Sequence, residues 1–421
     1  MNNPCALSSQ FLREQEGREK EATMGVRSVT RRQFLRAAGT VTAMTALGGM
    51  PFDVLAAPYE RRLVRFPEKT DLILLTSRPP QLETPLSYFK DSITPNDAVF
   101  VRWHISQVPT SVDLAAWRLK VGGNTDKELQ LSFDDLRKYE KVSYTAVIQC
   151  AGNGRSFFDP RVPGGQWKNG AMANVTWGGA RLKDVLNAAG VKAGSVDVSF
   201  NGLDYGPLPS VPDLVKSLPT DKALEEDILI AYEMNGKPLT MLNGFPARLI
   251  VPGWYATYWV KALSDISVNT KAFEGFWMNP AYRIPDTECG CIPPGSKPGR
   301  TVPINRMSTR SLIITPGEGE TLKANRPVTI SGVAFSGGYG IKDVIVSADG
   351  GRSWTQASLG KDLGKYAWVQ FSAPWKPAKA GSYTLMAKAT NGIGDSQPFE
   401  GLWNPAGYLW NKVQPLAVTV K

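Results

Sequence analysis

Tyr144-Thr-Ala-Val-Ile-Gln-Cys-Ala-Gly-Asn-Gly-Arg155 is an apolar run that ends at a cysteine and continues into small residues. Its β-branched and aromatic content predicts a strand over Tyr144–Ile148. The small residues after Cys150 leave room around the sulfur for a bulky group, and the nearby Arg155 favours a thiolate. A cysteine placed where a strand passes into a loop suits a nucleophile or a metal ligand, although a buried structural thiol is the plainer interpretation.

Around this stretch, short strand-like runs alternate with helical patterns. The runs expected as strands are Tyr144–Ile148, Val196–Phe200 and Arg248–Val251, and the expected helix is Leu182–Ala189. We therefore expect a mixed α+β domain over residues 58–306. Its first part, from Pro58 to about Val99, contains several helix-breaking prolines and is expected to be irregular and wrapped over a core.

The pattern changes after Ser311, where alternating apolar segments are separated by turns. The expected strands are Val328–Val333, Val344–Ala348, Tyr366–Phe371 and Tyr383–Ala389. Residues 307–421 therefore predict an all-β, immunoglobulin-like sandwich. The proline-rich segment 286–303, which contains Cys289 and Cys291, is the expected connection.

Composition excludes several cofactors. The 421 residues contain a single histidine, His104, so bis-histidine haem and multi-histidine copper, zinc or iron sites are ruled out within one chain. The four cysteines form no C-x-x-C-H motif and no four-cysteine cluster. The net charge of +10 favours an anionic substrate or an acidic partner. No long basic run is present, so we expect no nucleic-acid binding.

Residues 1–57 resemble a twin-arginine export signal. Arg31-Arg32-Gln-Phe-Leu35 precedes a weakly apolar stretch and then the small residues Ala56 and Ala57. The apolar stretch is too short to span a bilayer, so we expect cleavage after Ala56 or Ala57 and no membrane anchor. Such a signal implies a periplasmic protein. Met24 is an alternative start, because the residues before it are polar and add length that the signal does not need.

A series of ordered motifs resembles the sulfite oxidase family of molybdenum enzymes, and most closely its bacterial periplasmic sulfite dehydrogenases. The motifs are Phe100–His104, Gln149–Asn153, Trp167–Ala171, Trp177–Leu186, Ala231–Gly236, Gly244–Gly253 and Ala281–Pro285. The resemblance extends through the C-terminal sandwich, which is similar to the family's dimerisation domain. It therefore implies a molybdenum–molybdopterin cofactor and a homodimer.

The resemblance implies roles for individual residues. Cys150 would bind molybdenum through its thiolate. Catalytic substrate-pocket positions would be Arg102, Arg155, Trp167 and Tyr282. Pterin-binding positions would be Arg102, His104, Asn153, Asp204, Arg248, Trp259 and Lys261. Independently of the resemblance, alternation along an extended Phe100–His104 places Arg102 and His104 on one face.

Three features depart from the family or lack a role in it. Asn243 stands where animal members carry a histidine beside the pterin phosphate. The segment 403–410 contains no arginine where relatives place another substrate-pocket arginine, which makes the anion pocket less positive. Cys289 and Cys291 are close enough for a disulfide in an oxidising compartment, although so small a ring would be strained.

The resemblance implies oxidation of sulfite to sulfate, with electrons passed singly to an acceptor. Since the chain has no second histidine for a haem, we expect no haem on it and a separate periplasmic c-type cytochrome as acceptor, docked transiently or in a stable heterodimer. The alternatives are a sulfane-sulfur dehydrogenase of a thiosulfate-oxidising complex and a methionine sulfoxide reductase. A non-catalytic binding module is the remaining alternative.

Overall fold

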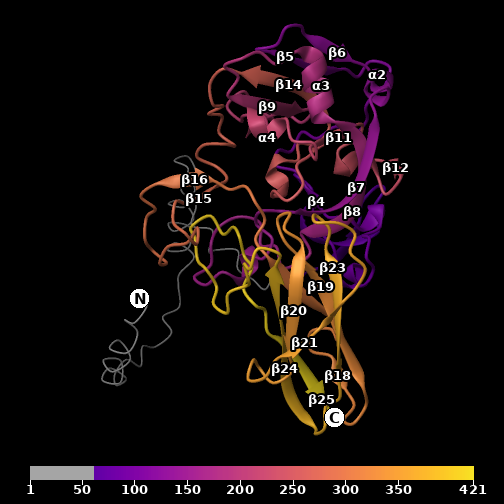
Figure 1. Ribbon diagram of the computed structural model, residues 1–421, viewed down its shortest axis with the longest axis vertical. Helices are drawn as coiled ribbons and strands as arrows, with labels where there is room; N and C mark the ends of the chain where they lie inside the picture. The colour runs from indigo at the N-terminus through magenta and orange to yellow at the C-terminus, as the bar shows by residue number, and fades with distance from the viewer. Residues whose placement is uncertain (1–60) are drawn as a thin grey trace, which may run out of the picture. The chain divides into compact units, whose positions relative to one another are not determined.

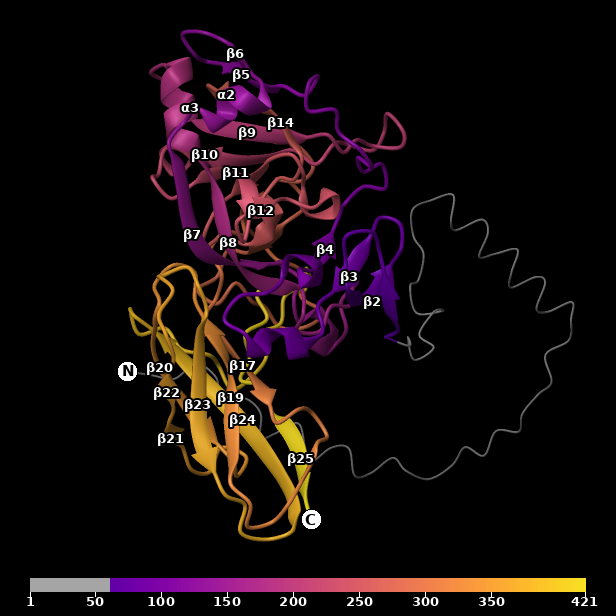
Figure 2. The same ribbon diagram turned by 90° about the vertical axis from the view of Figure 1, so that its right-hand side faces the viewer.

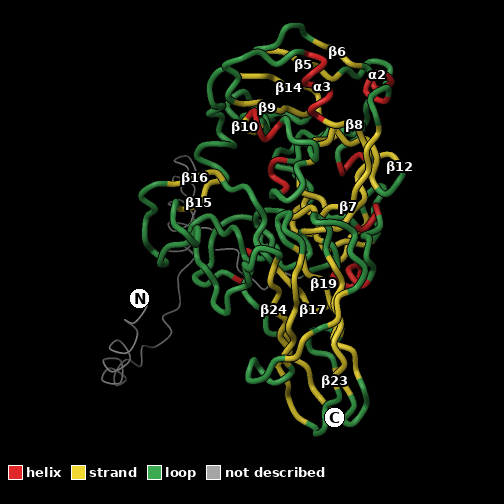
Figure 3. The backbone as a smooth tube through the Cα atoms, viewed as in Figure 1, coloured by secondary structure: helices red, strands yellow, loops and turns green. Residues whose placement is uncertain are grey.

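The computed structural model describes residues 61–421. The export signal, its cleavage site and the choice between Met1 and Met24 lie outside these residues. Among the regular elements of the described chain, strands (yellow in Figure 3) are far more extensive than helices (red). Its α-helices are short, namely α2 (Phe133–Arg137), α3 (Leu182–Ala189) and α4 (Thr220–Ala223). The region expected to be a mixed α+β domain is therefore mostly β, with few helices.

Three sheets build the region that contains Cys150. One sheet has the order β1 (Leu63–Arg65), β2 (Asp71–Thr76), β3 (Gln81–Glu83) and β4 (Val101–Arg102). The second has the order β10 (Lys216–Pro219), β9 (Asp197–Gly202), β14 (Leu263–Asn269), β5 (Leu119–Gly123) and β6 (Leu129–Leu131). The third has the order β12 (Lys237–Pro238), β11 (Leu229–Met234), β8 (Met172–Arg181) and β7 (Lys141–Gln149), and β13 (Arg248–Ile250) also pairs with β11.

The expectation of an irregular N-terminal part was wrong. Strands β1, β2 and β3 lie within it, followed by the 3-10 helices η2 (Leu86–Lys90) and η3 (Asn96–Ala98). The prolines fall between these elements, and Leu72 and Leu74 of β2 are buried with period two. The prolines therefore separate short strands rather than preventing them.

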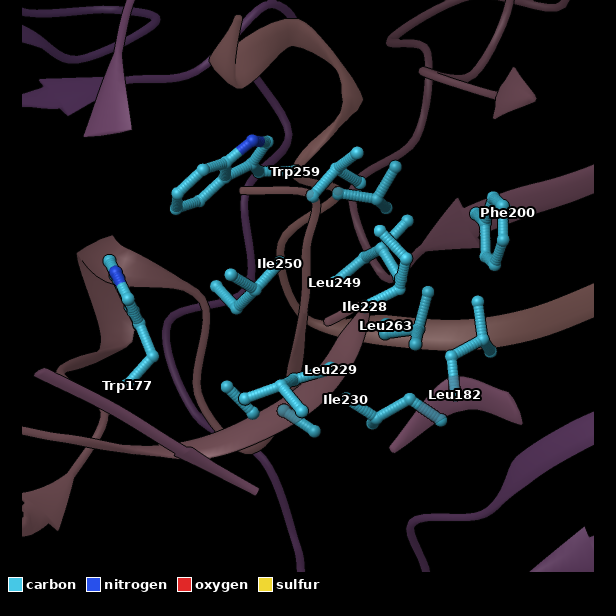
Figure 4. Packing of buried hydrophobic residues seen from close by; sticks show 14 of the residues in the cluster. Trp177, Leu182, Phe200, Ile228, Leu229, Ile230, Leu249, Ile250, Trp259 and Leu263 are labelled. Carbon is cyan, nitrogen blue, oxygen red and sulfur yellow. The ribbon is translucent and has the colours of Figure 1, made fainter. Parts of the chain in front are cut away.

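Helix α3 has the predicted bounds. Its buried residues are Leu182, Val185, Leu186 and Ala189, an apolar stripe at helical spacing. It ends at Gly190, whose positive φ of 73° suits a glycine. The helix covers a core that holds Leu229, Ile250 and two tryptophans, Trp177 and Trp259, as Figure 4 shows. This core fixes the ends of β7 and β13, where several of the predicted site residues lie.

Residues 310–421 form two sheets with a shared apolar core (Figures 1 and 2). One has the order β17 (Arg310–Thr315), β19 (Val328–Phe335), β23 (Val369–Trp375) and β22 (Ser358–Leu359). The other has the order β18 (Thr321–Leu322), β25 (Leu416–Val420), β24 (Gly381–Asn391), β20 (Ile341–Ser347) and β21 (Thr355–Gln356). Before them, β15 (Arg283–Pro285) and β16 (Thr301–Pro303) form a hairpin.

Buried hydrogen bonds join the two-sheet region to the cysteine loop. The fully buried Arg310 of β17 donates to the backbone oxygen of Asn153 at 3.4 Å and to Oδ1 of Asn169 at 2.6 Å. The backbone N–H of Val147 in β7 donates to the backbone oxygen of Tyr366 at 2.8 Å. Among residues 61–421, no helix is long and apolar enough to cross a membrane.

Candidate active site

Cys150 lies directly after β7, as the sequence predicts. It is a free, buried thiol, and its N–H donates to the backbone oxygen of Ala171 at 2.9 Å. Asn153 fixes the same loop, because its Oδ1 accepts the N–H of Ala171 at 3.0 Å and its Nδ2 contacts the backbone oxygen of Asn169 at 3.3 Å. The asparagine side chain is thus used within the protein, and its assignment to pterin stays a prediction.

The guanidinium of Arg155 is closely enclosed next to this loop by Gly152, Gly165 and Ala406, and we call this enclosure its seat. Its guanidinium donates to the backbone oxygens of Gly165 and Ala406, each at 3.2 Å, while its buried Nε has no partner in the described chain. A Cβ on Gly152 would lie 2.5 Å from this guanidinium, so only glycine leaves the seat open. The arginine can therefore donate to an anion without giving up its anchoring bonds.

A buried cavity adjoins Cys150. Its lining combines a thiol, several cations and aromatic rings, namely Phe100, Arg102, His104, Ile148, Cys150, Ala151, Asn243, Arg248, Ala256, Thr257, Lys261 and Tyr282. Its volume is about 30 Å³, which is enough for at least one water molecule. A second cavity of about 280 Å³, between η2 and β17, is lined by none of the predicted site residues.

Arg102 and His104 line the same cavity although β4 ends at Arg102. The His104 imidazole Nε2 is hydrogen-bonded to the Tyr282 hydroxyl, and its buried Nδ1 has no partner among the described residues. Burial, followed by the charges of Arg102, Lys261 and Lys216, lowers the pKa of His104 well below its ordinary value. The imidazole is therefore neutral and can accept one hydrogen bond and donate another.

Tyr282 lines the same cavity. It has a positive φ of 58°, which is uncommon for a residue with a side chain. Its ring stacks on Tyr408 with centroids 5.4 Å apart, and the Arg155 guanidinium lies 5.2 Å from the Tyr408 ring. Burial raises the pKa of Tyr282, so its hydroxyl stays protonated and can donate a hydrogen bond to an anion.

The remaining predicted cofactor residues supply buried cations. Arg248 donates to the backbone oxygens of Asn243 at 2.9 Å and Trp259 at 3.0 Å, and burial lowers its pKa to about 9. Trp259 contributes this carbonyl, while its ring packs edge-on against Trp177 in the core.

Lys261 and Asp204 form an electrostatically linked pair. The Lys261 ammonium lies 4.6 Å from the Trp103 ring centroid, and burial together with Arg248 lowers its pKa. Burial raises the pKa of Asp204, whose Oδ2 has no hydrogen-bond partner in residues 61–421. Five predicted site residues do not line the cavity, namely Asn153, Arg155, Trp167, Asp204 and Trp259. Trp167 is fully buried against Phe100, with ring centroids 6.4 Å apart.

Two buried lysines near the cavity were not predicted from the sequence. Lys216 is 1% exposed, its Nζ donates to the backbone oxygen of Trp277 at 2.5 Å, and it lies over the rings of Tyr258 and Tyr282. Lys69 donates to the amide oxygen of Asn243 and to two backbone oxygens. Burial lowers the pKa of both to about 7. A lone lysine carries no sequence signal of burial, so neither could have been found from the pattern.

The donor set fits an anionic group beside a soft metal. Arg102, Arg248 and Lys261 line the cavity, and the buried Nε of Arg248 and Nδ1 of His104 have no partners in the described chain. Buried cations are costly unless an anion neutralises them. Cys150 adds a thiolate, the ligand type that soft or thiophilic metals take. The residues present therefore fit a metal cofactor that carries negative charge.

Comparison with known proteins identifies the family. Residues 105–277 match the family described as "Oxidoreductase molybdopterin binding domain", and residues 301–420 match "Mo-co oxidoreductase dimerisation domain". The chain is 34% identical over 378 residues to mitochondrial sulfite oxidase of Homo sapiens, covering 85% of this chain and 67% of that protein. The chain belongs to the sulfite oxidase family.

Further similarities agree with this family. Sulfite oxidase of Arabidopsis thaliana is 31% identical over 379 residues, covering 82% of this chain and 94% of the plant protein. The crystal structure of the sulfane dehydrogenase SoxCD from Paracoccus pantotrophus aligns with a TM-score of 0.70 and 26% identity, covering 88% of this chain and 92% of that one. The sequence-based recognition of the sulfite oxidase family is thus confirmed.

Proposed function

We propose that this protein is a periplasmic, molybdenum-dependent sulfite dehydrogenase that oxidises sulfite to sulfate and passes electrons one at a time to a separate c-type cytochrome. One observation carries the proposal. A free thiol, Cys150, lies at a buried cavity lined by cations in a member of the sulfite oxidase family. Cys150 would hold molybdenum, and Arg102, His104, Arg248 and Lys261 would hold the pterin.

When bound, the molybdenum cofactor supplies the oxo transfer and the two-electron storage that sulfite oxidation requires. The protein positions the substrate. Arg102 and Arg155 can grip a pyramidal oxyanion through charge-assisted hydrogen bonds, and the protonated Tyr282 hydroxyl can donate another. The neutral His104 holds that hydroxyl in place. The product sulfate carries the same charge as sulfite and has similar oxygens. It would therefore meet the same side chains as it leaves.

Other expectations remain part of this proposal. They are export through residues 1–57, domains at 58–306 and 307–421, an immunoglobulin-like topology for the second domain, a homodimer and no haem on the chain. The match to a dimerisation domain supports the homodimer. The net charge of +10 supports docking of an acidic cytochrome face.

The test is elemental analysis of the exported protein for molybdenum, followed by sulfite-dependent reduction of ferricyanide or cytochrome c. Stoichiometric molybdenum with sulfite-dependent reduction is the expected result. Exported protein that contains no molybdenum would contradict the proposal.

A second candidate is dehydrogenation of protein-bound sulfane sulfur, because the solved structure of a sulfane dehydrogenase superposes over most of the chain. Molybdenum without activity on free sulfite, together with a haem protein that co-purifies stably, would favour this candidate over the first.

A further inference from the structure

Cys289 and Cys291 form a disulfide within the loop between β15 and β16. Cys289 is exposed, Cys291 is half-buried and Gly290 between them is buried. The proposed chemistry at Cys150 does not use this pair. Its surface position leaves one of its sulfurs open to a dissolved nucleophile.

The disulfide adds little to global stability. A cross-link stabilises mainly by closing a loop in the unfolded chain, and the gain is smallest for the shortest loop. These cysteines are only two positions apart. Thr287 already shapes the turn, because its hydroxyl accepts the Cys291 N–H at 3.1 Å and donates to the Cys291 backbone oxygen at 2.9 Å. Exposed disulfides of this kind belong to the labile class.

The cross-linked turn packs against a wall formed by Tyr282, which lines the cavity, and by Tyr408 and Leu409 behind it. A Cβ on Gly290 would lie 3.0 Å from Cδ1 of Leu409 and 3.1 Å from Cδ1 of Ile284, so the turn is packed closely against both. The Ile292 N–H donates to the backbone oxygen of Trp403 at 2.9 Å. Leu409 follows Tyr408, which stacks on Tyr282.

This wall contains two residues in the left-handed backbone region. Tyr282 has a φ of 58° and Leu409 a φ of 66°. Residues with side chains remain in that region only where their surroundings hold them there. The turn at Gly290 is part of those surroundings, since it contacts Leu409 itself and Ile284, two residues after Tyr282. A looser turn would therefore let this wall relax.

We propose that the Cys289–Cys291 disulfide is a sulfite-reactive modification site whose opening loosens the Tyr282–Tyr408 wall of the cavity. The sulfur lone pair of sulfite attacks Sγ of the exposed Cys289 and forms a new S–S bond. The Cys289–Cys291 bond breaks, and its electron pair goes to Sγ of Cys291, which takes a proton from water. The products are an S-sulfonate at Cys289 and a thiol at Cys291, with no other oxidant or reductant.

The choice of sulfite as the nucleophile rests on the proposed function, whereas the cleavage itself requires neither molybdenum nor turnover. Accumulated sulfite would modify the enzyme at a site separate from Cys150. The fraction of modified enzyme would then rise with the sulfite concentration. In that fraction, the changed Gly290 turn would loosen the Tyr282–Tyr408 wall.

The experiment treats the full-length holoenzyme with sulfite without an electron acceptor, with oxidised glutathione as the reactive reference. Intact mass should rise by one sulfite and one proton, one extra thiol should become alkylatable, and peptide mapping should place the sulfonate on Cys289. Amide hydrogen exchange in 403–410 should rise roughly tenfold. The variant Cys289→Ser/Cys291→Ser should gain no mass and should show the faster exchange without sulfite.

Dithiothreitol, which opens the disulfide without adding a sulfonate, should also accelerate exchange in 403–410. An unmodified protein under conditions that convert all the oxidised glutathione would overturn the proposal. A modified protein with unchanged exchange in 403–410 would overturn the link to the cavity wall. Formation of the adduct in a protein that contains molybdenum but does not oxidise sulfite would refute the proposed function alone.

Discussion

The seat of Arg155 allows the proposed anion grip to be tested without changing any charge. A Cβ on Gly152 would lie 2.5 Å from NH1, 2.6 Å from Cζ and 2.7 Å from NH2 of Arg155. Non-bonded heavy atoms prefer separations of about 3.5–4 Å, so Gly152→Ala must push the guanidinium by roughly 1 Å. The two anchoring bonds to Gly165 and Ala406, each 3.2 Å long, would then exceed hydrogen-bonding length.

The displaced arginine should lose one charge-assisted hydrogen bond to the substrate, worth about 2 kcal/mol, which corresponds to roughly a 30-fold change. We expect this change in the KM for sulfite, with a smaller change in kcat, because the bond is made to both the bound substrate and the transition state. Steady-state kinetics normalised to molybdenum content measure it. Gly152 does not have a positive φ, so alanine strains no backbone there.

Gly299→Ala is the matched control, because a Cβ at Gly299 meets nothing within 4 Å. Arg155→Met sets the upper limit of the effect. If Arg155→Met raises the KM while Gly152→Ala leaves it at the wild-type value, the reasoning from the seat is refuted.

Further predictions concern the thiol, a buried lysine and the contact between the two regions. Cys150→Ser should keep the circular dichroism spectrum but abolish sulfite oxidation, and near-normal turnover would contradict a metal-ligand role. Lys216→Met should raise the thermal midpoint at pH 6 by an amount equivalent to about 1–4 kcal/mol of unfolding free energy, because it removes a buried charge that no acid among residues 61–421 neutralises. The pKa of Lys216 is lowered to about 7, so between pH 7 and its ordinary value the unfolded state binds more protons. The wild type therefore gains stability as pH rises, and the advantage of Lys216→Met should shrink by pH 9; a constant advantage would argue against burial as the cause. Arg310→Met should lower the free energy of unfolding by about 2–3 kcal/mol, since it leaves the Asn153 and Asn169 oxygens unpaired, whereas the exposed Arg352→Met should have little effect.

Local patterns were enough for part of the fold. The helix Leu182–Ala189 was predicted because its apolar stripe and its terminal glycine are both local signals. The strand before Cys150 was predicted for the same reason. Strand β2, Asp71–Thr76, was missed because nearby prolines outweighed its short alternation of buried residues. Strand β2 lies between β1 and β3, so its formation depends on pairing with both neighbours as well as on its own residues.

The residues of the site also fall into those that local patterns predict and those that only tertiary packing places. Cys150, Arg102 and His104 lie at the cavity because a strand end and its alternation place them there. Lys216 and Tyr408 were missed because their positions result from tertiary packing, Lys216 beneath two tyrosine rings and Tyr408 stacked on Tyr282. The segment 403–410 had been noted only for the arginine it does not contain, yet it supplies an aromatic wall and the Ala406 carbonyl.

The Ala406 carbonyl is 251 residues downstream of the arginine it holds. A chain that leaves the ribosome N-terminus first exposes Arg155 long before this acceptor exists. Until the segment 403–410 packs against the cysteine loop, the hydrogen bond to Ala406 cannot form. Of the two anchoring bonds, only the one to the Gly165 carbonyl is then available to the guanidinium. The proposed anion grip would therefore be completed late in biosynthesis, and the capacity to bind an anion there would indicate that both regions have folded.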